Sequence, residues 1–157
     1  MQFLTFMLGG EMFAMGILAI KEIIEYSTPT EVPMMPASIR GVINLRGAVV
    51  PVVDLAVRFG RTPGAVTKRT CIVIVEISLK DSRQDVGVLV DAVNEVLEIS
   101  QDEIEAPPTF GTRIRTDFIQ GMGKVNNKFV ILLDANQVLT LDELAELAER
   151  VEEAPAA

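Results

Sequence analysis

The chain has 157 residues, 49% of them hydrophobic, which is enough for one ordinary domain or for two small subdomains that share a core. Lysine and arginine number 14 against 22 aspartates and glutamates, so the net charge of −8 disfavours nucleic acid and anionic membranes as partners and favours a protein partner. There is no apolar run near the roughly 18 residues of a membrane span, no cationic signal-peptide region at the N-terminus, and a single cysteine, so a cytoplasmic protein is expected.

Short runs of β-branched and aromatic residues, bounded by turn formers, predict a mainly β chain. Gly9-Gly10 separates the first two runs, and Val125-Asn126-Asn127-Lys128 predicts a hairpin tip, because asparagine tolerates the positive φ of tight turns. The spacing is typical of sandwiches or small barrels. The predicted strands are Phe3 to Leu8, Glu11 to Met15, Val42 to Leu45, Ala48 to Val53, Cys71 to Leu79, Val86 to Val90, Val96 to Ile99 and Phe129 to Leu133.

Residues 41–55 form the most informative of these segments, since two apolar strands flank a turn from which Arg46 projects. Pro51 removes a ladder donor, so its strand is expected to be an edge or to carry a bulge there. An exposed apolar edge invites aggregation unless a partner covers it. A binding face explains both features; the alternative is a solvated turn residue beside a proline that protects an edge.

The connection over residues 56–69 contains Arg58, Arg61, Lys68 and Arg69 and no acid. It is either a contact for an acidic partner or a solvated linker, and charge runs are usually the latter. Cys71 follows in an apolar run, which predicts a buried, inert thiol.

A helix is predicted at the C-terminal end of the chain, over residues 140–154. Thr140 can cap it, with Glu143 three residues further on, and the apolar residues that follow fall on one face. The opposite face is acidic and is expected to be solvated.

The chain also repeats itself. Residues 19–27 recur as residues 92–100 at an offset of 73, and Ile39, Gly41, Val50 and Asp54 recur as Ile119, Gly121, Val130 and Asp134 at an offset of 80. Two such long units indicate a duplicated subdomain. Only the first unit has Asn44-Leu45-Arg46-Gly47, which the second replaces by Lys124-Val125-Asn126-Asn127.

Residues suited to catalysis or metal binding are scarce. There is no histidine, and a single cysteine cannot build a zinc site, so no metal or cofactor is expected. Asp54 and Asp134 end the same strand in each repeat, which favours structural caps over a catalytic carboxylate pair. We therefore expect no enzymatic activity.

At the level of motifs, the chain resembles the CheW-like domain family of bacterial chemotaxis. The resemblance is carried by Asn44-Leu45-Arg46-Gly47, by Val50-Pro51-Val52-Val53-Asp54-Leu55 and by Ile20 and Glu22, and it extends to Phe3-Leu4-Thr5-Phe6 and Gly87 to Val93. It implies two small five-stranded SH3-like barrels that share an apolar core, with subdomains at about residues 1–67 and 68–139 and the helix at about 140–154.

The resemblance also implies a function. It implies a non-enzymatic adaptor that couples the cytoplasmic tips of methyl-accepting chemotaxis receptors to the regulatory domain of the histidine kinase CheA, without inserting into the membrane. Glu22 is expected to meet Arg46 and to support this contact surface. The kinase- and receptor-binding residues that it implies are Ile20, Glu22, Gly41, Asn44, Leu45, Arg46, Gly47, Val50 and Pro51.

Several alternatives stay open at this point. The same domain type occurs within CheA and CheV, although a chain of 157 residues has no room for a kinase or receiver domain. Paralogous adaptors that serve pili or other receptor arrays look alike. A small-ligand carrier is the rival from another class, because small barrels can enclose a ligand, yet the predicted strands offer almost no inward polar groups.

Overall fold

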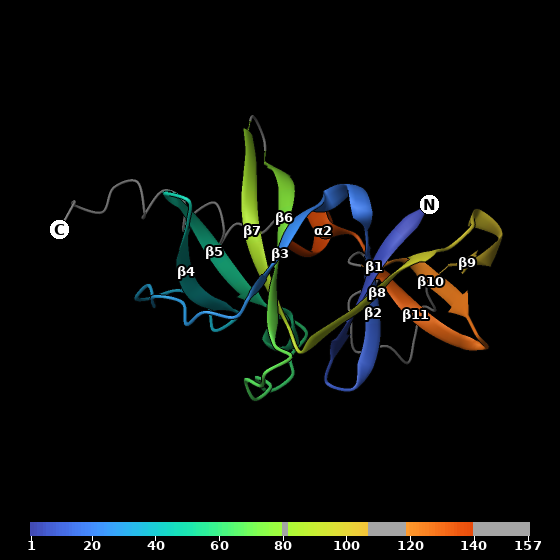
Figure 1. Cartoon of the computed structure of the whole chain (residues 1–157), viewed down its shortest axis with the longest axis horizontal. Helices are drawn as coiled ribbons and strands as arrows, with labels where there is room; N and C mark the ends of the chain where they lie inside the picture. The colour runs from blue at the N-terminus through green and yellow to red at the C-terminus, as the bar shows by residue number, and fades with distance from the viewer. Residues whose placement is uncertain (80–81, 107–118, 140–157) are drawn as a thin grey trace.

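The computed structural model describes residues 1–79, 82–106 and 119–139. Strands dominate it, as predicted, and they form two sheets that lie side by side in Figure 1. The helix predicted over residues 140–154 lies outside the described residues. In chain order the elements are β1 (Gln2–Leu8), β2 (Glu11–Gly16), the 3-10 turn η1 (Ile17–Ala19), β3 (Ile20–Glu25), β4 (Ile39–Leu45), β5 (Ala48–Asp54), α1 (Leu55–Arg58), β6 (Cys71–Leu79), β7 (Ser82–Val90), β8 (Ala92–Glu98), η2 (Gln101–Glu103), β9 (Ile104–Glu105), β10 (Ile119–Val125), β11 (Lys128–Leu133) and α2 (Ala135–Leu139).

Each sheet takes strands from both halves of the chain. The six-stranded sheet has the order β8-β1-β2-β11-β10-β9, and the five-stranded sheet has the order β3-β6-β7-β5-β4. The division expected near residue 67 therefore does not separate the sheets, because β1 to β5 begin both sheets and β6 to β11 complete both. The sixth strand, beyond the five expected for each barrel, is the two-residue β9 beside β10.

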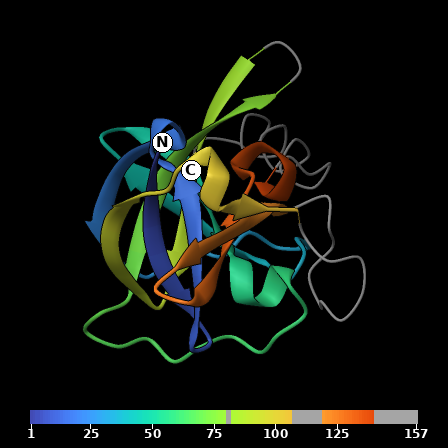
Figure 2. The same cartoon turned by 90° about the vertical axis from the view of Figure 1, so that its right-hand side faces the viewer.

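The sheets are joined at two places in the chain. The chain leaves the six-stranded sheet through η1 and returns to it through the single residue Asp91, between β7 and β8. In Figure 1, η1 lies at the top of this junction, and the β1–β2 turn, which Asp91 contacts, lies at the bottom. Figure 2 shows the six-stranded sheet from its outer side.

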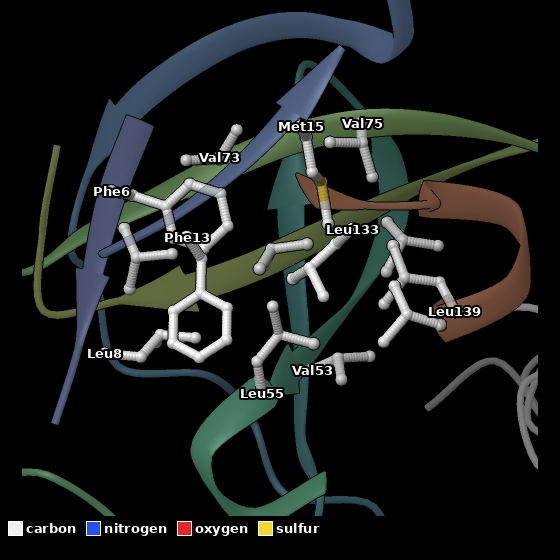
Figure 3. Close-up of a cluster of buried hydrophobic side chains, with 14 of the residues drawn as sticks. Phe6, Leu8, Phe13, Met15, Val53, Leu55, Val73, Val75, Leu133 and Leu139 are labelled. Carbon is white, nitrogen blue, oxygen red and sulfur yellow. The ribbon is translucent and has the colours of Figure 1, made fainter. Parts of the chain in front are cut away.

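A shared apolar core lies between the sheets, as expected. Phe6 and Phe13 of the six-stranded sheet are buried together with Val53 of β5 and Val73 of β6 (Figure 3). The rings of Phe6 and Phe13 stack with centroids 6.3 Å apart. Smaller apolar clusters on either side belong to one sheet each, so the shared cluster is what holds the two sheets together.

The two repeats use the same local devices. The hairpins β4–β5 and β10–β11 both turn through two residues with positive φ, which are Arg46 and Gly47 in one and Asn126 and Asn127 in the other. Two-residue turns with positive φ match the right-handed twist of the two flanking strands. The hairpin predicted at residues 125–128 is confirmed.

The two repeated aspartates are structural caps, as predicted. Asp54 Oδ1 accepts hydrogen bonds from the backbone N–H groups of Ala56, at 3.0 Å, and Val57. Asp134 Oδ1 accepts one from Gln137, at 3.1 Å. Each carboxylate thus satisfies free N–H groups at the start of a short helix.

Of the two expectations for Pro51, the edge strand is wrong, and the bulge lies one position away, between Ile39 and Gly41 opposite Val53 and Val52. Its strand β5 lies between β4 and β7 and is not an edge. Val42, opposite Pro51, directs its own N–H and C=O to Thr30, each bond being 2.8 Å long. The pairing of β5 with β7 begins only at Val52. Val42 and Pro51 therefore face each other without a backbone hydrogen bond between them, so the N–H that proline lacks removes no bond between β4 and β5.

Two expectations for the β5–β6 connection also need correction. Arg61 is not solvated, because its guanidinium donates to Glu11 in β2. Cys71 is half-buried and not fully buried, since it begins β6 and its thiol donates to the carbonyl of Arg69.

Candidate functional site

The β4–β5 hairpin presents the arginine that distinguishes the first repeat. Arg46 has φ 51° and Gly47 φ 87°, and Asn44 Oδ1 accepts a 2.8 Å hydrogen bond from the Gly47 N–H. The Arg46 side chain is 69% exposed. Arginine is uncommon in the left-handed region, where asparagine and glycine are favoured. The second repeat has Asn126 at this point, so local backbone preference does not explain the arginine.

An ion pair holds the Arg46 side chain against β3. Nη1 of Arg46 lies 3.2 Å from Oε1 of Glu22, and Nη2 contacts Oε2, which makes the pair bidentate. The Arg46 hydrogen bond holds the pKa of Glu22 below its ordinary value, and that of Arg46 is raised in turn. In the described part of the chain, the repeated Glu95 has no such partner.

This ion pair also brings together the two edge strands of the five-stranded sheet. β3 and β4 are its opposite edge strands, yet Glu22 of β3 reaches the turn that follows β4. Beneath the pair, Ile24 and Tyr26 pack with Leu45 on one apolar cluster. The ion pair therefore links β3 to the turn after β4, beside the apolar cluster of this sheet.

The structure distributes the expected binding residues over three environments. Asn44, Arg46 and Gly47 are exposed and lie together on the hairpin, with the half-buried Glu22 at its side. Ile20 and Leu45 are half-buried against apolar clusters. The remaining three are buried and offer no side chain to a partner: Gly41, Val50 and Pro51.

Gly41 has a structural reason to be glycine. Its φ is +141°, and a Cβ there would lie 2.2 Å from the carbonyl oxygen of Thr30. The repeat shows the same close approach, because a Cβ on Gly121 would lie 2.6 Å from Cγ2 of Ile104. Both glycines admit a neighbouring segment against the hairpin.

The sequence interpretation missed four exposed apolar residues. They are Ile23 and Val49 in the five-stranded sheet and Val96 and Phe129 in the six-stranded sheet. Ile23 matches Val96 at the offset of 73, and Val49 matches Phe129 at the offset of 80. Side chains alternate between the two faces of a strand, and this alternation along Ile20–Glu25 places Ile23 on the same face as charged residues. Alternation together with the internal repeat could therefore have identified these four exposed residues from the sequence.

A cleft of about 310 Å³ opens where the chain crosses between the sheets through η1. Leu18, on η1, is 88% exposed at this cleft, and Glu76 of β6 and Asp134 after β11 also line it. Glu76 at this cleft is ion-paired with Lys21, at 3.8 Å, and Lys21 also lies 3.1 Å from Asp85. The arrangement is an apolar residue beside a cleft with a charged rim.

Two kinds of feature are absent from the described residues, a metal-binding cluster and a membrane-spanning helix. Across residues 1–79, 82–106 and 119–139, no three His, Cys, Asp or Glu side chains gather as a metal site would require. Within the same ranges, none of the helices has the length and apolar character to cross a bilayer.

Comparison with known proteins gives a consistent result. The sequence profile of the CheW-like domain matches residues 2–143. The chemotaxis protein CheW of Bacillus subtilis strain 168 is 37% identical over 137 residues, which cover 87% of this chain and 85% of that protein. CheW of Klebsiella aerogenes is 32% identical over 144 residues, 92% of this chain and 84% of that protein. The crystal structure of the scaffolding protein TtCheW from Thermoanaerobacter tengcongensis superposes with a TM-score of 0.80 at 35% identity, covering 90% of this chain and 89% of that one.

Proposed function

The chain belongs to the CheW-like domain family, and from that premise we propose that it couples transmembrane chemoreceptors to the histidine kinase CheA. It is a scaffold of chemotaxis signalling and not an enzyme, in line with its relatives. It acts by binding both partners at once, in the cytoplasm, at membrane-associated receptor arrays. Many modest contacts then gain strength from the avidity of the array.

The exposed ion-paired arginine on the hairpin is the observation that carries this proposal. Arg46 has a positive φ, which favours asparagine or glycine, and its guanidinium forms a bidentate ion pair with Glu22 at the surface. An exposed ion pair adds little to stability. A contact with a partner gives the arginine a role that folding does not require.

We assign the kinase contact to the hairpin face, defined as Asn44, Arg46, Gly47 and Val49. Asn44 and Val49 are direct cross-strand partners, so their side chains lie on the same face. Val49 is 51% exposed and supplies the apolar part of this face. An apolar centre beside an arginine is a common composition of energetically important interface residues.

We assign the receptor contact to the cleft at η1. A helical tip that lies in a groove needs apolar anchors inside it and charges at the rim. Leu18 supplies the apolar anchor, Glu76 and Asp134 supply charges in the lining, and Lys21 is ion-paired with Glu76. The cleft takes residues from both sheets, so a bound helix would contact each of them.

The test is calorimetric titration into the isolated regulatory domain of a CheA from the same genome. Arg46→Glu and Val49→Asp are each expected to weaken binding about ten-fold or more, equivalent to about 1.4 kcal/mol. Phe129→Asp is the matched control, because Phe129 occupies the equivalent exposed position in the other sheet.

A receptor-tip fragment tests the second contact, and Leu18→Glu is expected to weaken that binding while leaving the kinase domain bound. If the folded wild-type protein binds neither partner, the proposal is wrong for this kinase and these receptors. Paralogous kinases would be titrated next. The opposite pattern, in which Phe129→Asp abolishes kinase binding and Val49→Asp does not, would move the contact to the six-stranded sheet.

A further inference from the structure

Arg61 makes a polar contact between the two sheets. It follows α1, which continues from β5 of the five-stranded sheet. Its Nη2 lies 2.6 Å from Oε1 of Glu11, the first residue of β2, and Nη1 donates to the carbonyl of Leu8 at 3.4 Å. The Arg61 side chain is only 23% exposed. One guanidinium thus binds both ends of the β1–β2 turn in the six-stranded sheet.

The backbone before Arg61 places it there. α1 ends with hydrogen bonds from the Gly60 N–H to Val57 O and from the Arg61 N–H to Ala56 O. Gly60 adopts φ 82°, which suits glycine at a helix C-terminus. Phe59 faces inward, where its ring stacks on Phe13 of β2 with centroids 5.7 Å apart. Residues 59–61 therefore join the sheets through one apolar and one ionic contact.

This contact lies where the chain returns to the six-stranded sheet. The Asp91 N–H donates to Met7 O, and Asp91 Oδ2 accepts from the Gly9 N–H at 2.8 Å. Arg61, Glu11, Gly9 and Asp91 line a cleft of about 470 Å³. In Figure 1 the β1–β2 turn lies at the bottom of the junction between the sheets and η1 at the top.

Apolar and polar contacts constrain the two sheets differently. Burial of the shared core opposes separation of the sheets, and the close packing of its side chains restricts sliding to small displacements. Hydrogen bonds and ion pairs depend on direction and distance, so they fix a position. We propose that Arg61 is a positioning residue, which sets how the five-stranded sheet sits on the six-stranded sheet and thereby shapes the cleft at η1.

The consequence for binding rests on the proposed function. The η1 cleft includes Gly16 and Leu18 from one side of the junction and Glu76 of β6 from the other. A small slide between the sheets changes the spacing of these residues without breaking either sheet. Loss of the Arg61 contact should therefore weaken receptor binding at a distance, while the hairpin face, which lies within one sheet, still binds the kinase.

The experiment measures the distance between the sheets directly. Spin labels at Glu25→Cys and Asp102→Cys, in a Cys71→Ser background, report one exposed position on each side of the junction. Distance distributions are compared for the parent protein, Arg61→Gln, Glu11→Gln and the charge reversal Arg61→Glu with Glu11→Arg. The control Arg83→Gln removes an Arg–Glu pair, 3.2 Å long, that lies wholly within the five-stranded sheet.

We expect Arg61→Gln and Glu11→Gln to shift or broaden the distribution and Arg83→Gln to leave it unchanged. The charge reversal should restore it in part, because it rebuilds the ion pair but glutamate at position 61 cannot donate to the Leu8 carbonyl. Receptor-fragment affinity should fall about three- to ten-fold in the two single variants and recover in part in the reversal, a coupling usual for residues in contact. Distributions that superimpose for the parent and Arg61→Gln would overturn the inference. If the parent binds no receptor fragment, the proposed function fails, whereas the distances still decide the role of Arg61.

Discussion

The substitution Gly41→Ala separates a structural role of this glycine from the binding role that family resemblance implies. At φ +141°, a region that is essentially restricted to glycine, alanine carries a backbone cost of about 1–3 kcal/mol. Its Cβ would lie 2.2 Å from a backbone carbonyl of Thr30, which cannot rotate away as a side chain would. The Thr30–Val42 bridge must then open, with loss of two hydrogen bonds of 2.8 Å. At about 1 kcal/mol for each bond, the total destabilisation is about 4 kcal/mol.

Urea unfolding followed by circular dichroism measures this cost. With a slope of about 2 kcal/mol/M, the midpoint of Gly41→Ala should fall by about 2 M. Gly47→Ala is the matched control, because Gly47 also has positive φ, at +87°, but no atom within 4 Å of the added Cβ. It should cost only about 1–2 kcal/mol.

The reasoning would be refuted if Gly41→Ala cost no more than Gly47→Ala, since the close approach would then not be real. A Gly41→Ala protein with parental stability and weakened kinase binding would instead support a direct contact at Gly41. Both outcomes are distinguishable in one preparation, because stability and affinity are measured separately.

Four further predictions concern the hairpin and the core. Arg46→Asn should keep or raise the urea midpoint, because asparagine suits positive φ, and should weaken kinase binding; a lowered midpoint would contradict this. The Glu22 carboxyl, titrated by NMR, should have a lowered pKa that returns to its ordinary value in Arg46→Asn. Because folding lowers this pKa, the stabilisation is present at neutral pH and is lost as the pH falls through the folded-state pKa, which unfolding at stepped pH would show. Phe59→Ala should cost about 3–5 kcal/mol by calorimetry, since the buried ring stacks on Phe13. Asp54→Ala should cost about 2 kcal/mol in urea, because it removes both the cap and the 3.1 Å ion pair with Arg40, and a neutral result would remove the capping argument.

Local features were predictable from the sequence because short-range sterics and hydrogen bonding decide them. Asn126-Asn127 predicts its hairpin, since positive φ is a property of those residues. Asp54 and Asp134 predict caps because each follows a strand and precedes free N–H groups. Because the chain is duplicated, the aspartate cap was predicted in both repeats. The Glu22–Arg46 contact came from family resemblance, and no spacing rule connects two residues on opposite edges of a sheet.

Burial at the candidate site could not be predicted in the same way. Gly41, Val50 and Pro51 belong to the motif, yet they face the interior, whereas Val49 beside them is exposed. Burial along β5 does not alternate, because Val50 and Val52 pack in the cluster within the five-stranded sheet and Val53 packs in the core shared with the other sheet. Both faces of the strand are therefore covered from Val50 onward, and which faces are covered depends on long-range packing that the motif does not contain.

The sequence by itself determined the strand content, the repeat, the turns and the caps, because each depends on residues a few positions apart. Only the tertiary structure decided which strands share a sheet, that Arg61 reaches Glu11, and that clefts open at both crossings between the sheets. The physical reason is that strand pairing and ion pairing here join residues distant in the chain. Their energies depend on where the whole backbone places them, which no local pattern encodes.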